Sequence, residues 1–260
     1  MKLSIIIPAH NEEKTIAEVL RKVLEVDLGG WEKQVVVVDD GSGDKTAGIL
    51  AEQKTKYSGR EILFSRHFKN LGKGAAIKTA LKKVSGDYII IQDADLEYFP
   101  EDIPKLLAAL TSANPHLPLS ASGHPLPSSF AKASADREGE EREHLVIFGD
   151  RGIKRYPERG FHYVVGAKIL TWTLNLLFDA RLHDLYTGYK LIPLQLIRSF
   201  NLESTGFEFE AEVACKTLKA GYKIMEVPIK YQPRDKSAGK HIRFFDAIKG
   251  FWTIIKYRLK

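Results

Sequence analysis

The chain has little cysteine and no long hydrophobic run. Cys215 is the single cysteine among 260 residues, so an internal disulfide is excluded. No segment approaches the run of about 18 apolar residues that a membrane-spanning helix needs. The apolar run after Met1 is short and polar residues follow it at once, which is unlike a secretory signal peptide. These absences predict a cytoplasmic protein, either free or peripheral on the cytoplasmic face of a membrane.

Two binding signatures are also missing. The sequence has neither zinc-finger spacing nor an RNA-binding motif, so we expect no nucleic acid partner. Its formal net charge of +6 suits phosphorylated partners or an anionic membrane face, although a solvated lysine-rich surface is the simpler explanation. The G-x-G-x-x-G fingerprint is absent, which argues against a dinucleotide-dependent redox enzyme. The segment Asn70–Gly74 lacks the spacing of a phosphate-binding loop, and we expect it to let a helix begin close to the sheet.

Short apolar runs alternate with helical patterns through the first half of the chain. The expected strands are Leu3–Ile7, Val35–Val38, Ile62–Phe64 and Tyr88–Ile91, and the expected helices between them are Glu13–Leu24, Asp44–Lys56 and Gly74–Val84. Further strands are expected at Leu145–Phe148 and Ile224–Ile229, with helices at Pro104–Leu110, Val164–Phe178 and Phe207–Ala220. This alternation predicts an α/β fold with a mostly parallel sheet flanked by helices.

Two segments depart from the alternation within what we expect to be a single domain, residues 1–260. Ser112–Glu143 is rich in Pro, Ser, Ala and charge, which predicts a mobile insertion. Ile242–Lys260 predicts a C-terminal amphipathic helix whose apolar stripe is flanked by lysines. Such a helix could rest in a membrane interface or pack on its own domain, and the pattern favours neither.

The strongest chemical signal is Asp93-Ala94-Asp95, directly after an apolar strand. Two carboxylates one residue apart at a strand end are costly to bury without a cation or hydrogen-bond donors. Mg²⁺ or Mn²⁺ takes few protein carboxylates and completes its shell with substrate phosphates and water. Such an ion would neutralise charge on a leaving diphosphate.

Two further polar clusters follow neighbouring strands. Asp39–Ser42 could bind the base or ribose of a nucleotide, or it could be a turn in which Asp40 and Ser42 satisfy backbone groups. Pro8–Glu12 follows the first strand and is expected to face the same cleft. Three polar strand ends at one edge of a parallel sheet are more specific than any one of them, because ligands bind beyond the carboxyl ends of such strands.

Seven motifs follow one another along the chain: SIIIPAHNEE, VVVVDDGSGDKT, NLGKGAAIKTAL, GDYIIIQDADLEY, HDLYTGYKL, GFEFEAEV and EVPIKYQPRDKSAGK. With these motifs the chain resembles family 2 glycosyltransferases of the GT-A fold, in particular the dolichyl- or polyprenyl-phosphate mannose and glucose synthases. The resemblance implies a doubly wound sheet and metal-dependent, inverting transfer of a hexose. The donor would be a nucleotide-diphosphate sugar of the GDP-mannose or UDP-glucose type, and the acceptor a polyprenyl or dolichyl phosphate. Some relatives carry transmembrane helices, which we do not expect here.

The resemblance also assigns roles to single positions. It implies nucleotide-sugar binding by Pro8, His10, Glu12, Val38, Asp40, Asp93, Ala94, Asp95, Arg234 and Lys240. His10 stands where the synthases usually carry Tyr. The implied metal ligands are Asp93, Asp95 and Glu97, with Glu97 at a position that is often Gln. Arg151 is implied to meet the acceptor phosphate.

The acceptor decides whether the reaction needs a general base. A hydroxyl acceptor needs one, and Asp184 and Glu210 are the candidates. A lipid phosphate is already anionic and needs cations to position it, which suits Arg151. Transfer to a sugar hydroxyl of a polysaccharide or glycolipid is therefore the alternative within the enzyme class. A non-catalytic nucleotide-sugar binding protein is the alternative outside it.

Overall fold

The computed structural model describes residues 1–113, 145–152, 161–234 and 244–260. Nearly all of the predicted insertion 112–143 lies outside these residues, as does Lys240. The strands are β1 (Lys2–Ala9), β2 (Glu32–Asp39), β3 (Ile62–Arg66), β4 (Tyr88–Ile91), β5 (Leu145–Asp150), β6 (Lys190–Pro193) and β7 (Lys223–Pro228). The helices are α1 (Ile16–Glu25), α2 (Thr46–Lys56), α3 (Lys73–Leu81), the 3-10 turn Pro100–Asp102, α4 (Ile103–Ala113), α6 (Phe161–Phe178), α7 (Leu194–Ser199), α8 (Phe209–Lys219) and α9 (Phe244–Leu259).

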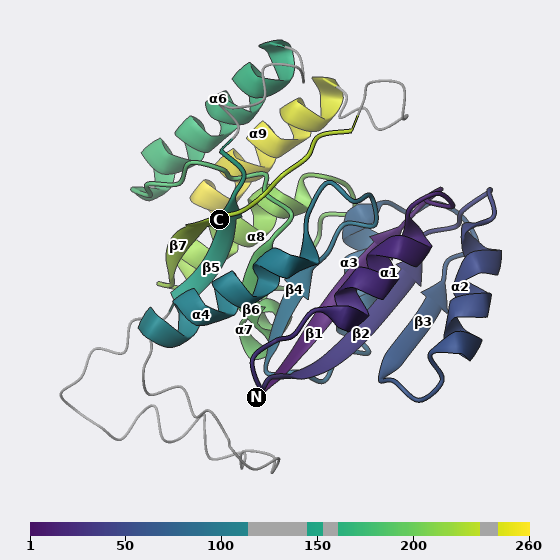
Figure 1. Cartoon of the computed structure of the whole chain (residues 1–260). Helices are drawn as coiled ribbons and strands as arrows, with labels where there is room; N and C mark the ends of the chain where they lie inside the picture. Colours follow the sequence, from purple (N-terminus) through teal and green to yellow (C-terminus); the bar gives the residue numbers. More distant parts are fainter. Residues whose placement is uncertain (114–144, 153–160, 235–243) are drawn as a thin grey trace.

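The seven strands form one sheet in the order β3-β2-β1-β4-β6-β5-β7 (Figure 1). The strands β3, β2, β1 and β4 are parallel, β6 runs antiparallel to both of its neighbours, and β7 is parallel to β5. The sheet is therefore mostly parallel, as the alternation predicts, with a single reversed strand near its middle.

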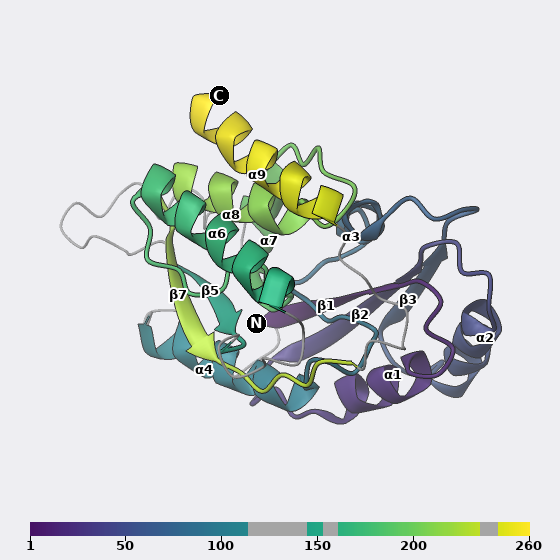
Figure 2. The same cartoon turned by 90° about the horizontal axis from the view of Figure 1, so that it is seen from above.

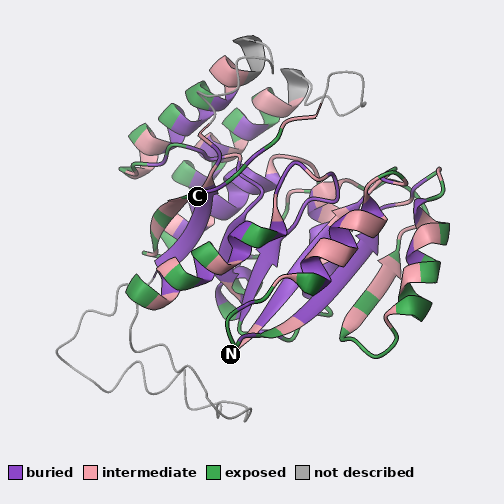
Figure 3. Cartoon of the chain, viewed as in Figure 1, coloured by how far each residue is buried: buried purple, intermediate pink, exposed green. Residues whose placement is uncertain are grey.

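Alternating side chains of the central strands fill two cores. In β1, Ile5 and Ile7 point to one face and Ile6 to the other, and all three are fully buried. The helices α1, α2 and α4 cover the first face, and α3, α6, α7, α8 and α9 cover the second. Seen from above, the sheet lies between these two helical layers (Figure 2). Burial of the central strands on both faces explains their continuous Ile and Val runs (Figure 3).

The expected elements all form, and three elements lack a sequence prediction: the short 3-10 turn Pro100–Asp102, the strand β6 and the helix α7. The strand β6 has only four residues, begins with Lys190 and ends with Pro193, so neither its length nor its composition is typical of a central strand. Its pairing with β4 and β5 fixes it, and the first turn of α7 follows directly. Both β6 and α7 depend on partners that are distant in sequence, and a local sequence pattern carries no information about such partners.

The helices α6 and α9 lie side by side at the outside of the second helical layer in both views (Figures 1 and 2). The buried side chains Leu170 and Leu174 of α6, and Ile254 and Tyr257 of α9, join the second core. The C-terminal helix thus packs on its own domain, one of the two expected arrangements. No helix in the described ranges combines the length and apolar character needed to cross a bilayer.

Candidate active site

Polar clusters follow the carboxyl ends of the neighbouring strands β1, β2 and β4. Ala9 pairs with Asp39 across β1 and β2, and the backbone amide of Gln92 donates to the carbonyl of Ile6 at 2.9 Å. The parallel register therefore brings the ends of these strands to one edge of the sheet. Asp93 follows Gln92 directly, so the expected convergence of the three clusters at one edge of the sheet is confirmed.

Asp39 and Asp40 both organise loops at this edge. Asp39 accepts a hydrogen bond from the amide of Ser42 at 2.9 Å and closes the turn itself. The Asp40 carboxylate accepts from the amides of Leu71 at 3.0 Å and Gly72 at 2.8 Å. Ser42 Oγ accepts from the amide of Asn11 at 3.0 Å. Asp40 and Ser42 therefore do satisfy backbone groups, as the turn alternative expected, although these groups lie on neighbouring loops and Asp39 closes the turn itself.

The other positions implied for the nucleoside differ in exposure. His10 is partly exposed, and its Nδ1 lies 2.9 Å from the carbonyl oxygen of Asp40. Pro8 is also partly exposed. The Val38 side chain is fully buried in the second core, so a nucleotide could meet this residue only through its backbone.

Asp93 and Asp95 are both buried at the end of β4. Asp93 Oδ1 forms an ion pair with Lys73 Nζ at 2.9 Å, and Asp95 Oδ1 accepts from the amide of Glu97 at 3.2 Å. Between them and Glu97 the backbone turns sharply, since Leu96 has a φ of 59°. Non-glycine residues rarely adopt this conformation, and strain of this kind is common at functional sites.

The donor set of this turn is suited to a hard divalent cation. Among the described residues, no three His, Cys, Asp or Glu side chains form a group that could hold a metal. The Glu97 carboxylate instead accepts from the Tyr231 hydroxyl at 2.7 Å and the Arg234 amide at 3.1 Å. Asp93 and Asp95 fit an ion that takes one or two carboxylates and draws its other ligands from a diphosphate and water.

Arg234 connects three of the predicted positions. Its Nε donates to the carbonyl oxygen of Asp95 at 2.9 Å, and its Nη2 forms an ion pair with Glu12. Burial raises the pKa of Glu12, while the hydrogen bond from Arg234 acts in the opposite direction. The guanidinium therefore joins the cluster after β1 to the turn after β4.

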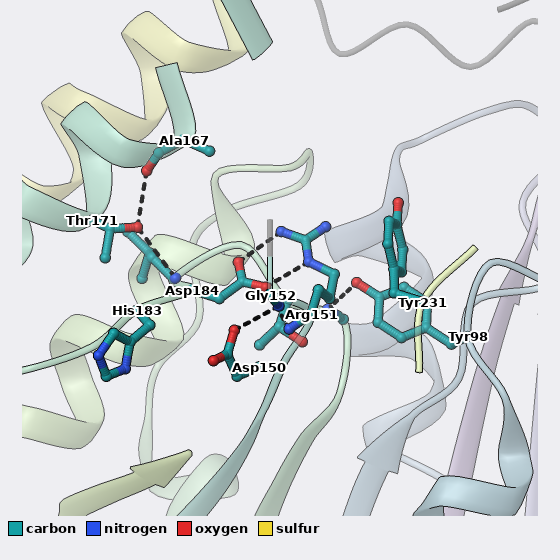
Figure 4. Close-up of polar contacts among 12 residues, drawn as sticks. Tyr98, Asp150, Arg151, Gly152, Ala167, Thr171, His183, Asp184 and Tyr231 are labelled. Carbon is teal, nitrogen blue, oxygen red and sulfur yellow. Dashed lines mark hydrogen bonds and ion pairs between the residues drawn. The ribbon is translucent and has the colours of Figure 1, made fainter. Parts of the chain in front are cut away.

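Arg151 and Asp184 form a buried, bidentate ion pair at the end of β5 (Figure 4). Arg151 Nε donates to Asp184 Oδ2 at 2.6 Å, and Nη2 donates to Oδ1 at 2.7 Å. The guanidinium carbon also lies 5.1 Å from the centre of the Tyr231 ring. Asp184 is thus bound as a carboxylate to an arginine, an arrangement that suits a positioning role better than proton abstraction.

Glu210 lies between two lysines. Its Oε2 accepts from Lys190 Nζ at 2.6 Å, and its Oε1 forms an ion pair with Lys73 Nζ at 2.9 Å. Burial lowers the pKa of Lys73, but the carboxylates of Asp93 and Glu210 outweigh this effect and raise it. Two ammonium groups on one buried carboxylate oppose a role for Glu210 as a general base.

Three residues of the site, Lys73, Lys190 and Tyr98, lack a prediction from the sequence. Lys73 lies in the segment that we expected only to start a helix, which it does as the first residue of α3. The Tyr98 hydroxyl accepts from the amide of Gly188 at 2.7 Å, close to Arg151 (Figure 4). The signal available for all three was their place within the resembling motifs NLGKG, DADLEY and TGYKL.

Comparisons with known proteins find relatives in sequence and in fold. An uncharacterized protein of Methanocaldococcus jannaschii is 31% identical over 239 residues, which cover 89% of each chain. The dolichol-phosphate mannosyltransferase of Pyrococcus furiosus is 26% identical over 99% of this chain but only 64% of its own length. A structure of glucosyl-3-phosphoglycerate synthase from Mycobacterium tuberculosis with Mn²⁺, uridine diphosphate and phosphoglyceric acid has the same fold. It matches with a TM-score of 0.63 and 18% identity over 99% of this chain and 78% of its own.

The chain also matches a known protein family over more than half of its length. The family described as glycosyl transferase family 2 matches residues 4–166, which include the strand ends of β1, β2 and β4 and Arg151. The chain therefore belongs to glycosyl transferase family 2 and is a glycosyltransferase.

Proposed function

We propose that the protein transfers a hexose from a nucleotide-diphosphate sugar to a polyprenyl or dolichyl phosphate, with inversion at the anomeric carbon. The observation that carries this proposal is the buried Arg151–Asp184 pair. An anionic acceptor needs a fixed cation, and Asp184 fixes Arg151 through two charge-assisted hydrogen bonds. A hydroxyl acceptor needs a general base, and ion pairs occupy both candidate carboxylates.

The donor would lie over the ends of β1, β2 and β4. Asp93 and Asp95 would hold Mg²⁺ or Mn²⁺, which supplies positive charge for the leaving diphosphate. His10, Glu12 and Asp40 lie on the side of β1 and β2 and would take the nucleoside. Arg234 would add a second cation beside the Asp95 turn. The mannosyltransferase named above and the Mn²⁺ and uridine diphosphate of the similar structure support a donor and metal of this type.

A transfer assay tests the proposal. The protein would be incubated with labelled GDP-mannose or UDP-glucose, Mg²⁺ or Mn²⁺, and polyprenyl phosphate in detergent. Asp95→Asn is the test variant. Asp87→Asn is the matched control, because Asp87 is an exposed carboxylate just before the opposite end of β4.

Three outcomes decide among the possibilities. Label in the lipid, lost with chelator or Asp95→Asn but kept in Asp87→Asn, supports the proposal. Transfer only to a hydroxyl-bearing sugar would replace the acceptor, and a product with retained configuration would contradict inversion.

We also propose that α6 and α9 bring this site to a membrane surface. Eleven large hydrophobic side chains are exposed in the described part of the chain, and seven lie on these two helices: Ile169, Trp172, Leu176, Ile248, Phe251, Trp252 and Leu259. Basic residues accompany them, with Lys168, Lys249, Lys256 and Arg258 against the single acidic Asp246 on the two helices. Aromatic and basic side chains together suit the surface of an anionic bilayer.

The same helices hold the loop that carries Asp184. On α6, Thr171 Oγ1 accepts from the amide of Leu185 at 3.3 Å (Figure 4). On α9, a Cβ at Gly250 would lie 1.9 Å from the Tyr186 hydroxyl. The helices that carry the exposed apolar side chains thus also contact the loop on the acceptor side of the site, where a lipid phosphate would enter.

Vesicle sedimentation tests the membrane proposal independently of transfer. Phosphatidylglycerol vesicles should retain the protein more than phosphatidylcholine vesicles, and Trp172→Ala with Trp252→Ala should weaken retention. Phe68→Ala is the matched control, since Phe68 is fully exposed away from these helices. Unchanged retention of the double variant, or loss of a concentration-dependent dimer in its place, would contradict the membrane proposal.

A further inference from the structure

Four charges of alternating sign form a continuous line through the interior. Lys190 Nζ lies 2.6 Å from Glu210 Oε2, Glu210 Oε1 lies 2.9 Å from Lys73 Nζ, and Lys73 Nζ lies 2.9 Å from Asp93 Oδ1. Lys190 is fully buried and Glu210 nearly so, whereas Lys73 reaches the edge of the site. The line therefore runs from the middle of the sheet to the predicted metal carboxylates.

A contribution to the stability of the fold does not by itself explain these four buried or partly buried charges. A buried ion pair gives little net stability compared with well-packed apolar residues, because both charges lose their hydration. Burial lowers the pKa of Lys190, which reflects this desolvation, and Glu210 offsets it only in part. Removing Glu210 would take away the carboxylate that balances the buried Lys190, whereas removing Lys190 would leave Glu210 paired with Lys73 alone.

Lys190 also holds the turn on the acceptor side. Its Nζ donates to the carbonyl oxygen of Leu185 at 3.1 Å and to that of Thr187. This turn follows Asp184, the partner of Arg151, and continues to Gly188. A Cβ at Gly188 would lie 3.0 Å from Asp93 Oδ2. One ammonium group thus contacts both the acceptor turn and the charge line that ends at Asp93.

We propose that Lys190 and Glu210 are a positioning pair that fixes Lys73 and Asp93 on the donor side and the 185–188 turn on the acceptor side. Neither residue touches substrate. The assignment of the two sides rests on the proposed function. Glu210 keeps Lys73 in place, and Lys190 keeps Glu210 in place while ordering the turn next to Arg151.

Three variants test the pair: Lys190→Met, Glu210→Gln and the double variant. Glu210→Gln should lower the thermal midpoint more than Lys190→Met, because Lys190 then lacks its carboxylate, whereas Glu210 without Lys190 still pairs with Lys73. The double variant should recover most of the loss, because the Lys73–Asp93 pair that remains is balanced. Calorimetry would measure binding of Mn²⁺ with GDP and of Mn²⁺ with UDP. We expect the better of these to weaken by about 10- to 100-fold in all three variants, as for other residues that orient metal ligands.

Gln34→Leu is the control for destabilisation. Gln34 is buried and accepts from Ser4 Oγ at 2.7 Å at the opposite end of the sheet. Its loss should lower the thermal midpoint without changing Mn²⁺–nucleotide affinity or kcat. This control keeps the comparison valid even if the double variant does not fold, since Glu210→Gln can then be compared with a variant of similar stability.

The outcomes separate this proposal from the proposed function. A double variant that recovers nucleotide affinity and kcat together with its thermal midpoint would show a merely structural pair and overturn the proposal. A Glu210→Gln variant with normal Mn²⁺–nucleotide affinity and lost kcat would restore Glu210 as a general base. A wild-type protein that binds Mn²⁺ with nucleotide but gives no lipid product would contradict the acceptor while leaving the positioning pair testable by calorimetry.

Discussion

Replacing Asp184 by Asn separates positioning from proton abstraction. Asn keeps one acceptor oxygen for Arg151 but turns an amide donor toward the second N–H, so one of the two charge-assisted hydrogen bonds is lost. The buried Arg151 guanidinium then loses the negative charge of the Asp184 carboxylate. Breaking a buried pair in this way typically destabilises a protein by about 3–5 kcal/mol. For a chain of this size, that corresponds to a thermal midpoint lower by roughly 10 °C.

The kinetic consequence should appear in acceptor use. If Asp184 positions Arg151, we expect the KM for polyprenyl phosphate to rise by about 10-fold or more, because a misplaced guanidinium binds phosphate poorly. Donor binding should stay within about 2-fold, since the Asp184 carboxylate bonds to Arg151 at the end of β5. Steady-state kinetics with varied acceptor and calorimetry with Mn²⁺ and nucleotide would measure both. A fall in kcat of about 10²- to 10⁴-fold at unchanged KM and unchanged thermal midpoint would refute this reasoning and identify a general base.

Three further changes test other parts of the structure. Asp95→Asn should lower kcat by about 100-fold or more. It should also remove the gain in nucleotide affinity that Mn²⁺ gives, measured by metal titration. Gly72→Ala should destabilise the fold by about 2–4 kcal/mol in urea unfolding, because Gly72 has a φ of 98° and an added Cβ would lie 2.4 Å from the Thr205 carbonyl oxygen. Burial alone raises the pKa of Glu212, but hydrogen bonds, including one from Tyr257, outweigh it and lower that pKa to about 2. Because the folded pKa lies below the unfolded one, this stabilisation is complete above about pH 4.5 and is lost as the pH falls toward 2. Glu212→Gln should therefore flatten the stability profile in that window, and an unchanged slope would contradict the assignment.

The parallel half of the fold could be predicted because its information is local. Runs such as Ile5–Ile7 and Val35–Val38 are apolar over a strand length, and helical patterns separate them. The reversed strand β6 could not be predicted this way, because Lys190 and Pro193 are not typical of a central strand. Its pairing with β4 and β5 fixes its conformation instead. Burial of the Lys190 ammonium group is offset by the Glu210 carboxylate and by the carbonyl oxygens of Leu185 and Thr187, all of which lie outside the strand itself.

The candidate site divides along the same line. The shared placement of Asp40, Asp93 and Asp95 was predictable because the carboxyl ends of parallel strands meet at one edge. The pairing of Arg151 with Asp184 was not, because it joins the end of β5 to a loop 33 positions further along the chain. Lys73 was overlooked because its role depends on Glu210, which an antiparallel strand and a distant helix bring beside it. The residue types suggested catalytic or binding roles for these side chains, but tertiary packing decides which ion pair each one forms.

This division bears on how acceptor specificity could change without loss of donor use. The proposed donor edge is built from β1, β2 and β4, whose register is fixed by continuous parallel pairing. The proposed acceptor side is built from the end of β5 and the 182–189 loop, which α6 holds through two hydrogen bonds between Asn175 and Leu182. Changes on α6 or α9 can therefore move the loop and Arg151 while the donor edge keeps its geometry. The Lys190–Glu210 pair sets the limit to such change, because it contacts both sides through one buried ammonium group.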